Sequence, residues 1–109
     1  MKGPKKFKVL GQPFKVRYAK TLHMKKFGAL NGRTRPDRGR VDLATKHLGE
    51  HKRAATYLHE LLHAVITVGS VVREHDTSEE DLVSSLTPIL LHTMRENPRV
   101  VAYLMKEGS

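Results

Sequence analysis

Two histidines and a glutamate form the most informative cluster of the sequence. His59 and His63 are four residues apart, and Glu60 directly follows the first of them. On a helix, this spacing places both imidazoles on one face, where they can share one zinc ion. Glu60 is rotated by about 100° around the helix axis, so we expect it to take a proton from a water on the open side of the metal. The pattern predicts zinc-dependent hydrolysis.

The segment around these residues has the pattern of a helix. Residues 50–68 contain no Gly or Pro, apolar residues recur there at helical spacing, and Gly69 is a plausible stop. Because His59 and His63 have apolar neighbours in the sequence, we expect the motif to lie on a largely buried helix.

A zinc site of this kind needs a third protein ligand, and the chain has no cysteine to supply it. The third histidine of the long metzincin motif would fall on Gly69, which excludes that class. A second helix is predicted to begin near residues 77–78, with Glu79, Glu80 and Asp81 in its first turn. Helical phasing slightly favours Glu79, and Glu80 also fits a capping box that closes the helix start. Spacing alone leaves the choice between the two glutamates open.

The other elements are predicted from alternation and turn signals. Residues 7–18 are expected to form a hairpin, and residues 41–44 a short strand at the edge of the sheet over the cleft. Residues 21–40 are expected to be mostly irregular, with a short helix near residues 23–27. Asn97-Pro98 should begin a terminal helix. The expected fold is α+β, a single domain over residues 1–109 with strands first and three helices after them.

The charge of the chain is unevenly distributed. Residues 1–40 carry 13 Lys or Arg and one acid, a net charge of +12, whereas residues 41–109 carry −3. Such an asymmetry indicates an anionic partner for the first part, or a solvated basic surface. The densest group is predicted to be a partner-binding loop before the edge strand, and it consists of Arg33, Arg35, Arg38 and Arg40.

The chain resembles the small phage and prophage metallopeptidase-like proteins of the broad ImmA/IrrE and SprT-like zincin group. The closest match is residues 56–65, Thr-Tyr-Leu-His-Glu-Leu-Leu-His-Ala-Val. The short strand at residues 41–44, the acidic start of the next helix and the late Asn97-Pro98 also fit. The resemblance implies a minimal zincin-like fold.

The resemblance also bears on the third ligand. In that family, a Glu followed by apolar residues three and six positions later supplies it. Glu80, with Val83 and Leu86, fits this pattern more completely than Glu79 does. The resemblance therefore implies a Zn²⁺ site whose ligands are His59, His63 and Glu80.

These observations predict a zinc-dependent metallopeptidase that hydrolyses peptide bonds of a protein substrate, with Glu60 as the general base. The alternative is a non-catalytic zinc-containing module whose basic N-terminal half binds nucleic acid or an acidic protein. The longest apolar run is too short and too polar to span a bilayer, and no apolar signal core follows the basic N-terminus. We therefore expect no membrane partner and a cytoplasmic location in a phage-infected or bacterial cell.

Overall fold

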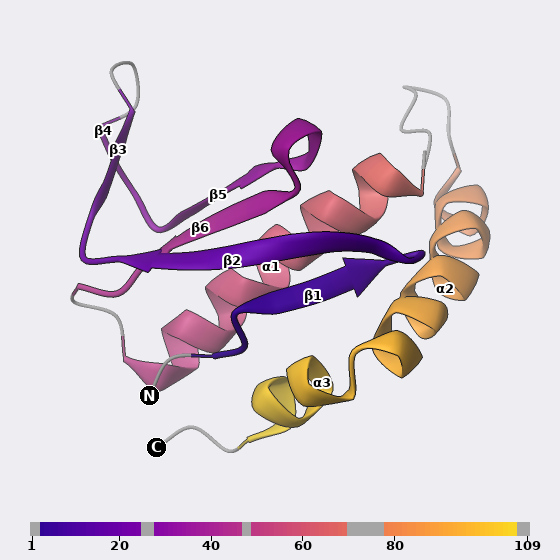
Figure 1. The fold of residues 1–109 in the computed structure, drawn as a ribbon. Coiled ribbons are helices and arrows are strands. Elements are labelled where there is room, and N and C mark those ends of the chain that lie inside the picture. Colours follow the sequence, from indigo (N-terminus) through magenta and orange to yellow (C-terminus); the bar gives the residue numbers. More distant parts are fainter. Residues whose placement is uncertain (1–2, 25–27, 47–48, 70–77, 107–109) are drawn as a thin grey trace.

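The computed structural model describes residues 3–24, 28–46, 49–69 and 78–106. Within these ranges the chain forms six strands followed by three helices, an α+β arrangement (Figure 1). The strands are β1 (Lys6–Val9), β2 (Gln12–Ala19), β3 (Leu22–Met24), β4 (Gly28–Leu30), β5 (Gly32–Arg35) and β6 (Arg40–Ala44). The helices are α1 (Glu50–Val68), α2 (Glu79–Glu96) and α3 (Pro98–Met105), and a single 3₁₀ turn, Pro36–Arg38, links β5 to β6.

Four of the strands make one mixed sheet in the order β1-β2-β6-β5. β1 and β2 form the predicted antiparallel hairpin, whose two turn residues, Leu10 and Gly11, have φ values of 50° and 80°. These left-handed conformations suit the tight turn that joins two twisted strands. β6 lies parallel to β2, and β5 returns antiparallel to β6.

The prediction for residues 21–40 was wrong. β3 and β4 pair antiparallel, with His23 opposite Ala29, so the helix expected near residues 23–27 does not form at His23 or Met24. Residues 25–27 lie outside the described residues. β5 was expected to be irregular and instead pairs with β6 along its whole length.

The strand predicted at residues 41–44 is present as part of β6, but its predicted place in the sheet was wrong. β6 lies between β2 and β5, so it is an interior strand. The outer strand on that side is β5, which also contacts α1. The edge beside the motif helix therefore belongs to residues 32–35.

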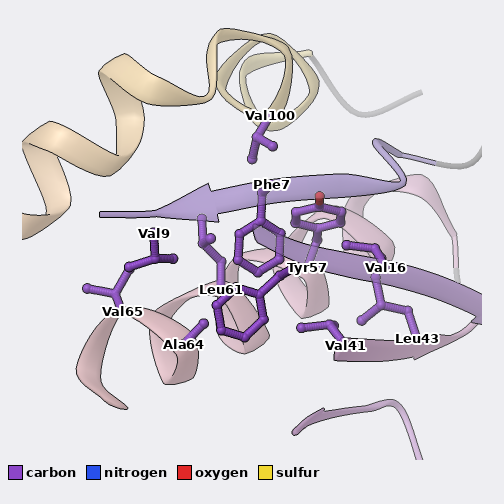
Figure 2. Close-up of a cluster of buried hydrophobic side chains, with 11 residues drawn as sticks. Phe7, Val9, Val16, Val41, Leu43, Tyr57, Leu61, Ala64, Val65 and Val100 are labelled. Carbon is purple, nitrogen blue, oxygen red and sulfur yellow. The ribbon is translucent and has the colours of Figure 1, made fainter. Parts of the chain in front are cut away.

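The core fills the space between one face of the sheet and α1 (Figure 2). Alternate residues of the strands point into it, and one face of α1 packs onto them. The rings of Phe7 and Phe14 stack with centroids 5.0 Å apart, and Tyr57 of α1 packs against Phe7 on one side and Tyr103 of α3 on the other. The remaining buried members are Val9, Val16, Val41, Leu43, Leu61, Ala64, Val65 and Val100.

All three helices occur where they were predicted. α1 ends at Val68, with Gly69 as its C-cap, and α2 begins after Ser78, whose hydroxyl accepts a hydrogen bond from the backbone N–H of Asp81 at 3.1 Å. α3 begins at Pro98 directly after Asn97. Among the helices described, none is long and apolar enough to cross a membrane.

Candidate metal centre

The two motif histidines converge on each other. Their Nε2 atoms are 3.2 Å apart, and the rings meet edge to face with centroids 4.8 Å apart. Two nitrogens that bind one tetrahedral zinc ion at about 2.0–2.1 Å lie about 3.3–3.4 Å from each other. The observed pair is therefore either a hydrogen bond between two imidazoles or a pair of ligands already at the spacing of a shared zinc ion.

The surroundings of the histidines differ from what the sequence predicted. One face of α1 is buried, as expected, but the side chain of His59 is 67% exposed and His63 is also exposed. The reason is the phase of the helix, because the buried Tyr57, Leu61 and Ala64 lie on the opposite side from the imidazoles. The histidines thus point away from the core and can be reached by a ligand from outside.

Glu60 lies between the exposed histidine face and the core. Its side chain is 7% exposed, and its Oε2 atom is 3.9 Å from the Nε2 atom of His59. Thr34 of β5 donates its hydroxyl proton to Oε1 of Glu60 at 2.7 Å, and the same hydroxyl is 3.1 Å from the backbone oxygen of Glu60. One carboxylate oxygen is therefore held by the edge strand, and the other faces the histidines.

Gly32 allows β5 to lie this close to α1. A Cβ atom at this position would be 3.0 Å from the side chain of Leu43, 3.1 Å from that of Glu60 and 3.1 Å from that of Thr56. A larger residue would push the strand away from the helix. Sequence reasoning missed both Gly32 and Thr34, because their roles depend on the pairing of β5.

The predicted third ligand, Glu80, belongs to α2. Glu80 lies in the first turn of α2, and the side chains of Glu79 and Glu80 are outside the described part of the structure. Since Ser78 is the N-cap, the third helical position is Asp81, so Glu80 does not occupy the capping-box position. Among the described residues, no group of three or more acidic or histidine side chains could hold a metal.

The arginines predicted to form a loop lie on regular structure. Arg33 and Arg35 belong to β5, Arg38 to the 3₁₀ turn and Arg40 to β6. The Nε atoms of Arg33 and Arg40 are 2.9 Å and 3.4 Å from Oδ2 of Asp42, whose side chain is 7% exposed. Two of the four arginines therefore neutralise a buried carboxylate, and the partner-binding role of the group stays a prediction.

Two open depressions meet at the motif. One is lined by Asn31, which directly precedes β5, and by residues of α1 that include Lys52 and Thr56. The other is lined by residues that include Arg33, Pro36 and Thr67. Gly32, His59 and Glu60 line both of them. The surface beside β5 is thus hollowed around His59 and Glu60, and His63 lines the second depression.

Comparisons of this chain with protein-family models, with curated proteins and with solved structures find no match.

Proposed function

We propose that this chain is a zinc-dependent metallopeptidase with a minimal zincin-like fold. The observation that carries the proposal is the 3.2 Å separation of the His59 and His63 Nε2 atoms beside a buried glutamate. Neutral imidazole nitrogens at this spacing suit zinc, and the third ligand we propose is Glu80, on the family resemblance. The exposure of both histidines leaves room for the remaining ligands.

The residues of the chain divide the chemistry between them. A zinc ion at this site would polarise the scissile carbonyl and lower the pKa of the attacking water to about 7. Oε2 of Glu60, which faces the histidines, would take a proton from that water and pass it to the nitrogen of the leaving amine. Thr34 holds Oε1, so the carboxylate keeps one orientation during both transfers.

The substrate we propose is an extended segment of a protein. Within the described residues β5 has a strand partner on one side only, and its other side runs past the motif. A peptide could add to this edge through main-chain hydrogen bonds, which would place a backbone carbonyl near the histidine pair. In this proposal, β5 takes the place at the edge of the cleft that the sequence predicted for residues 41–44.

Zinc content tests the metal centre. Purified protein should contain about one zinc ion per chain, and His63→Ala should lose it. His92→Ala is the matched control, because His92 is an exposed helical histidine outside the motif. Glu80→Ala should release zinc far more readily than Glu79→Ala. Wild-type protein that remains metal-free after reconstitution with zinc would refute the centre, and an equal effect of the two glutamate variants would refute Glu80 as the ligand.

Hydrolysis tests the role of Glu60. Glu60→Gln should retain zinc while its cleavage of a labelled unstructured protein falls by at least about 100-fold, since a general base contributes 10²–10⁴. Loss of zinc from Glu60→Gln to the same degree as from His59→Ala would contradict the assignment. A zinc-loaded wild-type protein that cleaves nothing in a panel of unstructured proteins would favour the second candidate, a non-catalytic zinc-containing binding module.

A further inference from the structure

The register of the sheet places basic residues from all four strands in one row. Lys6 of β1 is opposite Lys15 of β2, Lys15 is opposite Arg40 of β6, and Arg40 is opposite Arg35 of β5. Strands lie about 4.8 Å apart, so this row extends about 14 Å across the sheet. The sequence alone did not indicate this row, because its first and last residues, Lys6 and Arg40, are 34 positions apart.

The row lies on the face of the sheet that points away from the core. The residues that alternate with it, among them Phe7, Val16 and Val41, are buried against α1. Lys6 and Lys15 are exposed, and Arg35 and Arg40 are partly exposed. In Figure 1, α1 lies behind β2. Because the row alternates with residues that are buried against α1, it lies on the opposite face of the sheet.

Further cations on the same face enlarge the row into a surface, which we call the basic sheet face. Arg17 and Arg33 flank Asp42 in the adjacent row, and Lys8 lies two residues beyond Lys6 on β1. The full set is Lys6, Lys8, Lys15, Arg17, Arg33, Arg35 and Arg40. These four strands therefore carry seven cations and one acid, Asp42.

Asp42 positions part of this surface without neutralising it. Its carboxylate pairs with both Arg33 and Arg40, which leaves a net positive charge even in this cluster. The pKa of Arg35 is lowered, chiefly by the guanidinium of Arg33, as expected where cations crowd together. An anionic partner would relieve this repulsion, and guanidinium groups held in place suit phosphate oxygens.

We propose that the basic sheet face binds the phosphate backbone of nucleic acid without reading its sequence. About 14 Å of the axis of a duplex carries about four phosphates of each strand, so the row is long enough to contact several phosphates. The aromatic residues of these strands, Phe7, Phe14 and Tyr18, lie on the core-facing side, so the four strands themselves offer no ring for stacking on bases. The partner is therefore recognised by its regular negative charge.

The test measures binding to a 20-base-pair DNA duplex as a function of salt. Lys6→Gln, Lys15→Gln and Arg35→Gln are combined, because none of these three residues pairs with Asp42 among the contacts described. Affinity at 0.1 M salt should fall on the order of 100-fold, and the slope of log K against log salt should decrease by about 2–3. A second duplex of unrelated sequence should bind the wild type equally well.

The matched control removes the same charge from elsewhere. Lys52→Gln, Arg95→Gln and Lys106→Gln are exposed positions outside the sheet, and their combination should change the affinity by less than about threefold. His63→Ala should bind DNA as the wild type does, so the outcome is independent of the zinc centre. Equal weakening by the two triple variants, or none by the first, would overturn the proposal. Tighter binding of polyglutamate of equal charge would overturn it in favour of an acidic protein.

Discussion

A carboxylate that is almost completely buried must be held by hydrogen bonds, and Glu60 has one from the neighbouring strand. Burial of an unpartnered polar group costs several kcal/mol, so the Thr34 hydroxyl at 2.7 Å offsets part of the cost of placing Glu60 under the strand. It engages Oε1, whereas Oε2 is the atom that faces His59. Thr34 is thus a positioning residue for the proposed base.

Thr34→Val should test this role, because valine keeps the shape of threonine and removes the hydroxyl. We expect a loss of about 1–3 kcal/mol in the free energy of unfolding, since Glu60 stays buried without this donor. We also expect a lower kcat for hydrolysis with unchanged zinc content. The measurements are urea unfolding, zinc analysis and steady-state kinetics.

Thr34→Ser provides the control for that prediction. Serine retains the donor, so it should restore kcat most of the way to the wild-type value although it lacks the methyl group. If Thr34→Ser were as slow as Thr34→Val, the hydrogen bond to Glu60 would not be what positions the carboxylate.

At the scale of elements, local patterns were sufficient for the helices and the first hairpin. α1 was predicted with its observed bounds, because its apolar residues repeat with helical period between Gly49 and Gly69. The hairpin was predicted because Phe7 and Val9 alternate with lysines before a turn. In both cases, the signal lies within a short stretch of sequence.

β5 shows why the rest could not be predicted. Its sequence, Gly-Arg-Thr-Arg, contains no apolar residue, so no alternation marks it as a strand. It is held by contacts distant in sequence: pairing with β6, the close fit of Gly32 against α1 and the hydrogen bond from Thr34 to Glu60. The order of strands likewise depends on where β5 lies, which is why β6 was mistaken for the edge.

The side chain of Asn97 joins the opposite edge of the sheet to the helices. Its Oδ1 atom accepts a hydrogen bond from the backbone N–H of Lys8 at 2.7 Å. Its Nδ2 atom donates to the backbone oxygens of Lys8, at 2.6 Å, and Thr93, at 2.7 Å. Asn97 is the N-cap residue of α3, as the Asn97-Pro98 pair predicted, but its side chain makes no capping hydrogen bond and joins the α2–α3 corner to β1.

Asn97→Ala should lower the free energy of unfolding by about 2–3 kcal/mol, because it removes partners of the Lys8 backbone and of the Thr93 oxygen together. Urea unfolding measures the change. Asn31→Ala, at an exposed position, is the control and should cost less than about 0.5 kcal/mol. An equal loss in both variants would show that the amide of Asn97 contributes no particular stability.

At the scale of the whole molecule, β5 connects the two proposed surfaces. Gly32 and Thr34 face α1 and the histidine pair, and Arg33 and Arg35 alternate with them toward the basic sheet face. A peptide added to the edge of β5 would therefore lie next to nucleic acid bound on the outer face. This geometry would favour protein substrates that are themselves bound to nucleic acid.

The N-terminal segment is joined to the body of the molecule by two tyrosines. The hydroxyls of Tyr18 and Tyr57 both donate to the backbone oxygen of Pro4, at 3.0 Å and 3.2 Å. Burial raises the pKa of each phenol well above its usual value near 10. Folding thus favours the neutral form of both side chains.

The sign of the resulting pH dependence follows from these shifts. Below about pH 10 the phenols are neutral in the folded and the unfolded chain, so they add no pH dependence. Above that pH the unfolded chain loses phenolic protons that the folded chain retains, and stability falls as the pH rises. Tyr18→Phe/Tyr57→Phe should be less stable than the wild type at pH 7 by about 1–3 kcal/mol, for two lost hydrogen bonds. The difference should shrink between pH 9 and pH 11, as measured by urea unfolding.

Thr93→Val is the matched control for this prediction. Thr93 is buried and its hydroxyl donates to the backbone oxygen of Ile89 at 2.8 Å, so the variant also loses a hydrogen bond but no titrating group. Its stability should run parallel to that of the wild type from pH 7 to pH 11. A constant difference between the wild type and the double tyrosine variant over this range would contradict the raised pKa values, because titration of the lysines affects both proteins equally.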